Sequence, residues 1–367
     1  MTVHIPADRL AHVCAAAFER VGSSPDEARR VAASLVGANL AGHDSHGVIR
    51  VPRYLDWVRS GDIVPNQTIE VVTDTPVLAV VDGRYGFGQT VAPLAVAIGI
   101  EKAKAMGLAA VALRNAAHIG RVGEWAEQAA AAGLASVHFV TASGSILVAP
   151  RGGVERRLST APFCVGVPRR GEEPVVLDFA TSLVAEGKVA VASRGGKPLP
   201  EGALVGPDGA PSSDPAMLYG PLTPEGPRDP MAGPGAIRAF GEHKGSGLAL
   251  MCELLGGSLT GTGATGPGRR FANGMFSLYI DPARIDPEGF FDGDVGRYLA
   301  WFKTARTMPG HGILTPGEPE RAARATRLAE GVPLPEETWA SIAEAARGVG
   351  VEERLIAGAP GPARPQT

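Results

Sequence analysis

The segment Gly261-Thr262-Gly263-Ala264-Thr265-Gly266 matches the G-x-G-x-x-G fingerprint of dinucleotide-binding βαβ units letter for letter. In such units a strand precedes the glycines and a helix follows them, so that backbone N–H groups face a pyrophosphate. Here the order is reversed. The periodicity of residues 247–255 predicts a helix before the glycines, and Pro267-Gly268-Arg269-Arg270 begins no helix with an apolar face. We therefore interpret the segment as a glycine-rich loop and not as part of a Rossmann unit.

Short β-rich runs alternate with helical patterns on both sides of this loop. The runs are Val77–Val81, Leu108–Leu113, Ala135–Val140, Val175–Phe179 and Met275–Ile280. A helical pattern through residues 91–98 lies between the first two. This alternation predicts an α/β domain, although it does not show whether the strands are parallel. Residues 194–240 are dense in Pro and Gly, and we expect a long, mostly irregular excursion there.

Both ends of the chain have amphipathic helical patterns, the first over residues 8–20. In Ser24-Pro25-Asp26-Glu27 the serine fits an N-cap, the proline a first helical position and the glutamate the reciprocal position of a capping box. A third pattern spans residues 51–58, and one through residues 339–346 is able to return to the opening helices. The sequence thus opens as a small helical unit, and we expect the Pro/Gly-rich tail after Ala357 to be disordered.

Composition and charge exclude several classes of protein. The 367 residues are 44% hydrophobic and 20% charged, which suits a globular chain long enough for two domains. The net charge of -3 gives no basic field for nucleic acid or an anionic membrane surface. The start of the chain lacks the features of a signal peptide, and no stretch approaches the ~18 apolar residues of a membrane helix. Because the three cysteines are also scattered, as in a reducing compartment, we expect a cytoplasmic protein.

The polar segment His43-Asp-Ser-His-Gly-Val-Ile-Arg50 joins two helical patterns. The side chain of His46 titrates near neutral pH, as proton transfer to a reacting carbonyl requires. If the segment is helical from His46, Arg50 lies four residues on and shares its face, where it can clamp a carboxylate. A polar loop in which Asp44 or Ser45 caps the next helix is an alternative. A metal site is another, although no further ligand motif completes it.

Three later segments also carry candidate groups. His118 lies within residues 114–121, at a strand-to-helix corner where α/β enzymes expose reactive side chains, although a structural hydrogen-bond donor is the alternative. Asp178 follows a buried strand and can bond a ribose or a catalytic histidine, or simply cap a turn. Lys188 can meet a phosphate or be solvated. The segment Gly241–Gly247 places a lysine between glycines at a helix N-terminus, which forms either an anion site or a flexible helix entry.

Taken together, these segments resemble the non-Rossmann malate/L-lactate dehydrogenase family. That family includes ureidoglycolate and sulfolactate dehydrogenases, a diketogulonate reductase and a cyclic-imine-2-carboxylate reductase. The motifs that carry the resemblance are His43–Arg50, Asp82-Gly83 with Gly86-Phe-Gly88, Arg114-Asn115 with His118-Ile-Gly120, Leu177–Ser182, Gly187-Lys188, Leu199–Gly202 with Asp208-Gly209, His243–Gly247 and Thr315–Glu318. One such motif alone is weak, but the ordered series, from about residue 40 to residue 345, is highly specific.

The resemblance implies a fold that the local patterns do not show. A helical domain is built from both chain ends, here 1–74 with 311–356. A mixed, mainly antiparallel α/β domain, here 75–310, binds NAD or NADP without a Rossmann unit, and 357–367 remain as the tail. Members of the family are typically homodimers with the site near the subunit interface. The implied activity is hydride transfer between the cofactor and a small 2-hydroxy or 2-oxo acid, with no metal ion.

The resemblance also assigns roles to individual residues. His46 and His118 would be the two candidate proton donors and acceptors. Arg50 would face the substrate carboxylate, with Ser45 and Ser143 as further substrate contacts. The residues that would line the cofactor are Asp178, Phe179, Ala180, Thr181, Ser182, His243, Lys244, Pro316, Gly317 and Glu318.

Two departures from the family concern the substrate. The family usually reads Gly-Thr-Asn-Pro where this chain has Ser159-Thr160-Ala161-Pro162, so an amide is missing. The stretch from Asp208 to His243 is longer and richer in proline than usual. Two other functions therefore stay as alternatives. One is a metal-dependent hydrolase or lyase that uses His43, Asp44 and His46, and the other is an inactive small-molecule-binding module.

Overall fold

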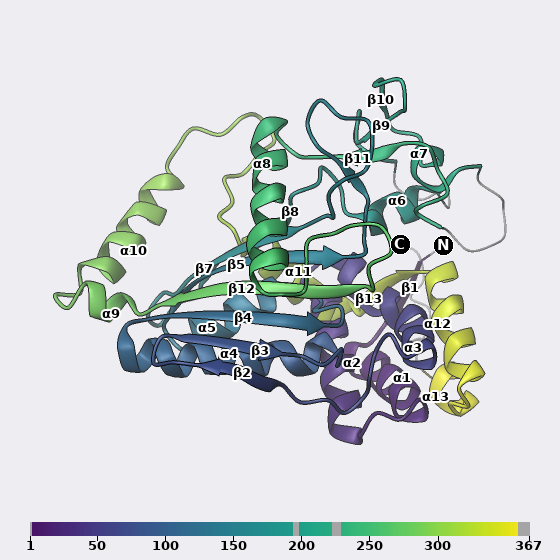
Figure 1. Ribbon diagram of the computed structural model, residues 1–367, viewed down its shortest axis with the longest axis horizontal. Helices are drawn as coiled ribbons and strands as arrows, with labels where there is room; N and C mark the ends of the chain where they lie inside the picture. Colours follow the sequence, from purple (N-terminus) through teal and green to yellow (C-terminus); the bar gives the residue numbers. More distant parts are fainter. Residues whose placement is uncertain (1, 194–197, 222–228, 359–367) are drawn as a thin grey trace.

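The computed structural model describes residues 2–193, 198–221 and 229–358, and its centre is a seven-stranded sheet (Figure 1). In spatial order the strands are β2 (Glu70–Asp74), β3 (Leu78–Asp82), β4 (Leu108–Ala116), β12 (Ala272–Ile280), β5 (Ala135–Ser143), β7 (Pro162–Val167) and β8 (Val175–Ala180). β3 and β4 are parallel, and the other neighbouring pairs are antiparallel. The predicted mixed, mainly antiparallel α/β fold is therefore confirmed, and all five β-rich runs lie in this sheet.

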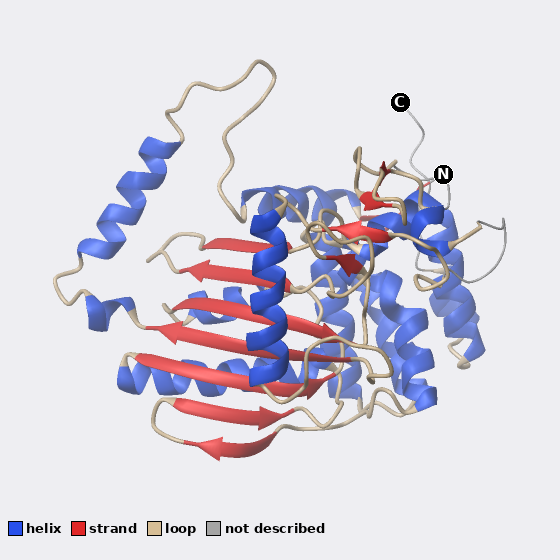
Figure 2. Ribbon diagram, turned by 45° about the horizontal axis from the view of Figure 1, so that its top comes forward, coloured by secondary structure: helices blue, strands red, loops and turns tan. Residues whose placement is uncertain are grey.

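Helices cover both faces of the sheet. α4 (Gly88–Met106) and α5 (Gly123–Ala131) pack on one face, where Trp125 belongs to the buried core. α8 (His243–Cys252) continues as the π-helical segment η3 (Glu253–Leu259) and crosses the other face (Figure 2), where η3 packs on β5 and β12. The glycine-rich loop 261–266 follows η3 and leads into β12. A helix therefore precedes these glycines and a strand follows them, as the sequence predicts.

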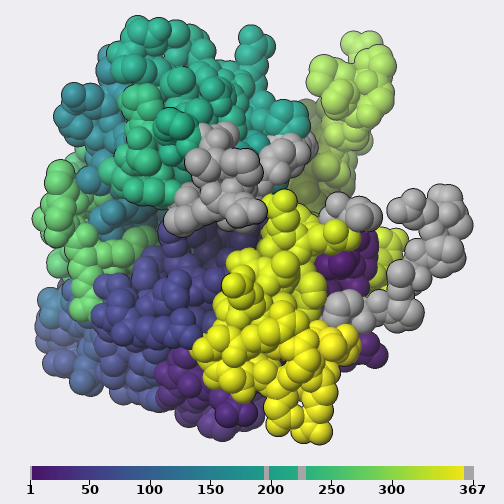
Figure 3. All heavy atoms as spheres, turned by 90° about the vertical axis from the view of Figure 1, so that its right-hand side faces the viewer, coloured from purple at the N-terminus to yellow at the C-terminus, as the bar shows by residue number. Residues whose placement is uncertain are grey.

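A second core is built from both ends of the chain. Its helices are α1 (Ala7–Arg20), α2 (Pro25–Leu40), α3 (Val51–Ser60), α12 (Glu336–Gly348) and α13 (Glu353–Ala357). The N-terminal segment, in purple and blue, lies beside the C-terminal segment, in yellow (Figure 3). β1 (Thr2–Ile5) pairs antiparallel with β13 (Val332–Pro335) and fastens the two ends together. The predicted helices over 8–20, 51–58 and 339–346 are confirmed.

The division of the chain at 74/75 and 310/311 stays a prediction. β2 pairs with β3 and so belongs to the sheet, although its residues precede the first of these boundaries. The expected disordered tail, 357–367, lies outside the described residues from residue 359 onward. Within the described ranges, no helix is both long and apolar enough to cross a membrane.

The capping box predicted at the start of α2 is only half formed. Ser24 Oγ accepts a hydrogen bond from the N–H of Glu27 at 3.3 Å. The N–H of Ser24, however, donates to Asn66 Oδ1. The buried Glu27 carboxylate accepts from the N–H of Asn66 and from the Thr90 hydroxyl. The reciprocal half of the prediction is therefore wrong, because Glu27 ties α2 to distant parts of the chain instead.

The described parts of residues 194–240 contain a few short regular elements; residues 194–197 and 222–228 lie outside them. A small four-stranded sheet forms from β10 (Pro211–Ser212), β9 (Leu204–Val205), β11 (Ala236–Arg238) and β6 (Val148–Ala149). α6 (Glu186–Ser193) precedes it, and α7 (Ala216–Tyr219) lies beside it. Leu204, Leu218 and Ile237 share a buried core. Most of the described residues of this stretch are irregular, as predicted, but apolar residues spaced among the prolines and glycines still build a core of their own.

α10 (Phe290–Phe302) projects away from the body beyond α9 (Pro282–Ile285) (Figure 1). Phe290 and Trp301 on this helix are 71% and 63% exposed. Isolated helices of this length are marginal in water, and large exposed apolar side chains mark interaction surfaces. α11 (Glu318–Glu330) then brings the chain back against α2.

Candidate active site

Residues 43–50 form two short 3-10 turns, Asp44–His46 and Val48–Arg50, with Gly47 between them. His46 and Arg50 therefore do not share a face of one helix, and that sequence expectation is not met. Arg50 instead folds back, and its Nε donates to the carbonyl oxygen of Ser45 at 2.7 Å. The guanidinium still lies on the same loop as the imidazole.

Asn39, near the end of α2, holds this loop in place. Its side chain is buried; Oδ1 accepts from the N–H of Val48 at 2.8 Å, and Nδ2 donates to Asp44 Oδ1 at 2.6 Å. A Cβ at Gly47 would overlap the Asn39 amide, so this close approach requires glycine. From α11, Arg327 donates to the Asp44 carboxylate and to the Asn39 carbonyl oxygen. Segments from both ends of the chain thus fix the loop that carries the first histidine.

His118 follows β4 at a corner with unusual backbone geometry. Arg84, Tyr85 and Asn115 have φ values of 51°, 58° and 53°. The N–H of Tyr85 donates to the carbonyl oxygen of Asn115 at 2.7 Å, so these residues meet. Left-handed backbone at non-glycine residues persists only where surrounding contacts over-determine it, and it clusters at functional sites.

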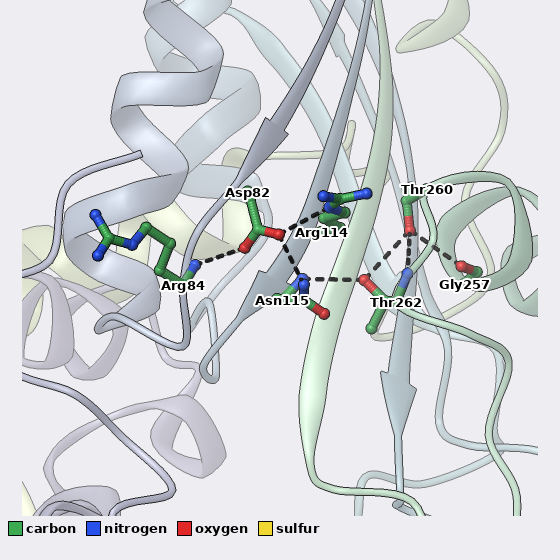
Figure 4. Close-up of polar contacts among 7 residues, drawn as sticks. All are labelled: Asp82, Arg84, Arg114, Asn115, Gly257, Thr260 and Thr262. Carbon is green, nitrogen blue, oxygen red and sulfur yellow. Dashed lines mark hydrogen bonds and ion pairs between the residues drawn. The ribbon is translucent and has the colours of Figure 1, made fainter. Parts of the chain in front are cut away.

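The contacts that hold this corner centre on Asp82 (Figure 4). Its carboxylate accepts from the N–H of Arg84 at 2.8 Å, from Arg114 Nε at 2.8 Å and from Asn115 Nδ2 at 2.9 Å. The N–H of Asn115 donates to Thr262 Oγ1 at 3.1 Å. The glycine-rich loop 261–266 therefore supports the corner that leads to His118.

The two histidines come together. Their ring centroids are 5.5 Å apart and their planes differ by 15°. His46 Nδ1 lies 3.0 Å from Ser45 Oγ, and His118 Nδ1 lies 2.6 Å from the Tyr54 hydroxyl. Tyr54 accepts from Gln89 Nε2 at 3.1 Å, which leaves its own proton for His118 Nδ1. In this arrangement a neutral His118 carries its proton on Nε2.

Burial and nearby positive charge keep both imidazoles neutral. Burial lowers the pKa of His46 from 6.5 to about 3, and the charge of Arg50 adds to this effect. Burial, followed by the charge of Arg50, also holds the pKa of His118 well below 6.5. Near neutral pH both rings are therefore unprotonated, and each is a weak base while the Arg50 charge is uncompensated. An anion bound at Arg50 would offset its charge and raise both pKa values.

The guanidinium of Arg50 also faces a carboxylate. Its Nη2 lies 3.9 Å from Glu186 Oε2, and both side chains are less than one-fifth exposed. Tyr219, from α7, donates to Glu186 Oε1 at 2.6 Å. The site thus combines two neutral imidazoles with one partly compensated guanidinium.

His43, Asp44 and His46 point to different partners. His43 Nε2 lies 3.2 Å from Glu320 Oε1, Asp44 pairs with Arg327, and His46 faces the other imidazole. In the described part of the chain, no three His, Cys, Asp or Glu side chains are gathered as metal ligands. This geometry gives no support to a metal-dependent hydrolase or lyase.

Asp178, on β8, accepts from the N–H of Gly123 at the start of α5, with Oδ2 2.7 Å away. Burial raises the pKa of this carboxyl. Asp178 therefore caps the start of α5, which corresponds to the capping role that the sequence offered as the alternative to bonding a ribose or a catalytic histidine. Phe179 packs edge-on against the rings of Phe163 and Phe240, and Ala180 is half-buried beside it.

The hydroxyls of Thr181 and Ser182 are turned inward. Thr181 Oγ1 donates to the carbonyl oxygens of Thr160 and Ala161, and Ser182 Oγ donates to that of Val184. A ligand at this strand end would therefore meet the backbone and not these hydroxyls. Sequence reasoning gave no signal for this orientation.

The remaining residues expected to line a cofactor lie at the two ends of β8. His243 and Lys244 are exposed at the N-terminus of α8. A bridge between Ser182 and Ala239 brings this region beside the strand end. The turn Pro316-Gly317-Glu318 lies at the other end, since a Cβ on its glycine would be 3.5 Å from the backbone of residues 174 and 176.

Two positions expected to bear on the substrate are enclosed. Ser143 is buried at the end of β5, and its contact with substrate stays a prediction. Ala161 is buried with a φ of 28°. Asparagine tolerates positive φ better than alanine does. The change from Asn to Ala at this position therefore makes the backbone conformation less favourable and also removes a side-chain amide.

Sequence reasoning missed the residues that hold the imidazoles. Tyr54 and Gln89 occupy buried helix positions that read as ordinary core, and Arg327 is remote in sequence. Asn39 and Gln89 are polar residues on buried helix faces, and buried polar groups need partners. That is the one signal from which they could have been found.

Comparisons with known proteins agree with this arrangement. The sequence model of the family described as malate/L-lactate dehydrogenase matches residues 5–343. Hydroxycarboxylate dehydrogenase B of Escherichia coli (strain K12) is 40% identical over 348 residues, which cover 93% of each chain. Malate dehydrogenase of Pyrococcus abyssi is 34% identical and covers 95% of this chain and 96% of its own.

Solved structures show the same fold. An E. coli protein assigned as a malate/lactate dehydrogenase has a TM-score of 0.88 at 38% identity, covering 97% of this chain and 98% of its own. The comparisons give no support to a hydrolase, a lyase or an inactive binding module. The chain therefore belongs to the malate/L-lactate dehydrogenase family and is an oxidoreductase that acts on hydroxy acids.

Proposed function

We propose that the chain transfers a hydride between NAD or NADP and C2 of a small 2-hydroxy or 2-oxo acid. Arg50 binds the substrate carboxylate, and His46 or His118 moves the proton of the C2 oxygen. The observation that carries the proposal is the pair of neutral imidazoles, 5.5 Å apart, beside Arg50. Ser45, which contacts both His46 and Arg50, and Ser143 complete the proposed substrate contacts.

Oxidation of the hydroxy acid needs a neutral imidazole, and a bound carboxylate makes that imidazole a stronger base by offsetting the Arg50 charge. One imidazole accepts the hydroxyl proton while the hydride leaves C2. In the reverse direction the same group must be protonated. The substrate carboxylate supports this by offsetting the Arg50 charge that lowers both pKa values. Substrate binding and proton uptake are thereby coupled.

The residues proposed to hold the cofactor fit a phosphate-bearing molecule. Lys244 places an exposed ammonium at the N-terminus of α8, where the helix dipole also favours an anion. His243, Asp178, Phe179 and Ala180, with the backbone of residues 181–182 and the turn 316–318, would complete the binding surface. When bound, the nicotinamide supplies or accepts the hydride.

The first experiment measures absorbance at the NAD(P)H band with a panel of 2-hydroxy and 2-oxo acids, using each cofactor in turn. His46→Ala and His118→Ala then separate the two proton-transfer candidates. The true acid–base group loses about 10²–10⁴ in kcat with near-normal cofactor binding. Near-wild-type turnover in both variants contradicts the assignment.

We also propose that the protein is a homodimer in which a second copy covers α10. The exposed Phe290, Tyr298 and Trp301 on this projecting helix support that arrangement. Light scattering should give the mass of a dimer. Trp301→Asp should lower the mass towards that of a monomer, whereas Leu328→Asp, at an exposed position on α11, should not. A monomeric wild-type protein would refute the dimer.

A cytoplasmic location and the two-domain division complete the proposal. Cys14, Cys164 and Cys252 are all free and buried, as in proteins of reducing compartments. Fractionation of cells that produce the protein tests the location. Limited proteolysis tests the domain boundaries, since cleavage should concentrate between compact units.

A further inference from the structure

A fixed carboxylate lies inside the proposed substrate site, next to the residue that binds the substrate. Glu186 Oε2 is 3.9 Å from Arg50 Nη2, and the two side chains are 17% and 18% exposed. Glu186 Oε1 accepts a 2.6 Å hydrogen bond from the Tyr219 hydroxyl. Tyr219 is itself only 5% exposed. The carboxylate is thus held by a buried group and cannot swing freely into solvent.

The backbone brings Glu186 close to the histidine loop. α6 begins at Glu186 and packs against the 3-10 turn Asp44–His46. A Cβ at Gly187 would lie 2.8 Å from the Cβ of Ser45, so this approach requires glycine. Tyr219 comes from the small four-stranded unit that the proline-rich stretch builds. That unit therefore contributes a group to the site.

Arg50 and Glu186 are partly buried charges of opposite sign that face each other in the site. Besides burial, the positive charges of Arg50 and Arg53 lower the pKa of His118. Besides burial, the negative charge of Glu186 raises the pKa of Tyr219, and the same two arginines oppose that rise. The imidazoles are neutral, and burial together with Glu186 raises the pKa of Tyr219, which stays protonated. Arg121, which also acts on His46, is paired with Glu127. Arg53 is exposed, so solvent screens its charge, and a bound acid meets the partly buried pair of Arg50 and Glu186.

We propose that Glu186, held by Tyr219, is a specificity-determining residue that selects 2-hydroxy acids with a single carboxylate. The rest of the substrate is neutral or donates a hydrogen bond to Glu186. Arg50 pairs with one anionic group of a bound acid, so a second anionic group, such as that of malate, adds to the Glu186 charge without a guanidinium of its own to offset it. This inference rests on the proposed function, because it takes Arg50 as the carboxylate-binding residue.

The expected size of the effect follows from the repulsion of like charges. Two charges about 5 Å apart near a protein surface repel strongly enough to change binding by roughly ten- to a hundredfold after screening by salt. Removing the Glu186 charge should therefore improve the use of a dianionic acid by that factor. Use of a monoanionic acid should change much less.

The test compares L-malate with L-lactate, by kcat/KM and by equilibrium binding. Glu186→Gln should raise the malate-to-lactate ratio at least about tenfold. The matched control Glu173→Gln, at an exposed carboxylate, should leave the ratio unchanged. Tyr219→Phe keeps the Glu186 charge but frees its carboxylate, so the ratio should stay near the wild-type value. An unchanged ratio in Glu186→Gln, or an equal rise in Tyr219→Phe, overturns the inference.

The binding measurement separates failure of this inference from failure of the proposed function. If no acid is oxidised, but lactate still binds more tightly than malate and Glu186→Gln reverses that order, the proposed reaction is wrong and the role of Glu186 stands. If oxidation proceeds, but the wild-type protein and Glu186→Gln have the same malate-to-lactate ratio, the role of Glu186 is wrong and the reaction stands. Binding of neither acid overturns both.

Discussion

Asn39→Asp tests whether the contact between Asn39 and Asp44 holds the His46 loop. The substitution keeps the size of the side chain, but it replaces the donor Nδ2, 2.6 Å from Asp44 Oδ1, with a carboxylate oxygen. At an effective dielectric constant of about 20, two charges about 3 Å apart repel by roughly 5 kcal/mol. Because Arg327 donates to Asp44 from the other side, part of this is offset. We expect a loss of about 2–4 kcal/mol in the free energy of unfolding near pH 8.

The loss should depend on pH in a defined direction. Two carboxyls this close share a proton in the folded state, so their folded pKa lies above the unfolded value of about 4. A raised folded pKa means that the folded state binds more protons, and stability is lost as pH rises through that pKa. The deficit of Asn39→Asp should therefore shrink between about pH 8 and pH 5.

Urea unfolding at both pH values measures the loss in the free energy of unfolding. The value of kcat/KM under the same conditions shows whether the His46 loop keeps its active conformation. Asn39→Ala removes both side-chain bonds without adding a charge, so its deficit should be similar at both pH values. If the two variants show equal and pH-independent deficits, the carboxylate pair does not form, and our account of the loop is refuted.

Three further predictions concern the support of the site and the sheet. Tyr54→Phe should lower kcat by about tenfold or more with little change in KM, if the hydroxyl orients His118; an unchanged kcat points to the other histidine. Gly99→Ala should lower the free energy of unfolding by about 1–3 kcal/mol in thermal unfolding, because the added Cβ overlaps a buried aromatic ring. The control Gly37→Ala, on α2 with open space around it, should raise the free energy of unfolding by about 0.5–1 kcal/mol. Burial lowers the pKa of His138 to about 3, so the unfolded state binds a proton that the folded state does not. This residue alone should lower the free energy of unfolding by up to about 1.4 kcal/mol for each pH unit below about pH 6.5. His138→Gln should therefore show a shallower pH dependence in acid unfolding.

The sequence predicted most of the regular elements because their signals are local. Apolar alternation and run length located the five strands, and Ser24-Pro25 located the start of α2. The reversed order of helix and glycines around residues 261–266 correctly argued against a Rossmann unit. The small sheet that joins β6 to strands within residues 204–238 escaped notice because its strands have only two or three residues and form a core with one another.

The site was predictable in its residue types but not in its geometry. His46, His118 and Arg50 could be named from motifs, yet their approach depends on contacts between segments far apart in the chain. The Asp44–Arg327 pair joins positions 283 residues apart, and Tyr54 meets His118 across 64 residues. Hydrogen bonds of this kind leave no spacing in the sequence. The same holds for Glu186 and Tyr219, which meet only because a proline-rich stretch folds.

The pairing of β1 with β13 and the reach of Arg327 to Asp44 have a consequence for biosynthesis. The first three helices are translated about 260 residues or more before the partners that complete their core and brace the histidine loop. Until then their apolar faces stay uncovered, as in the intermediates that chaperones bind. A nascent chain of this protein should therefore become able to turn over substrate only after α11, β13 and α12 have been made.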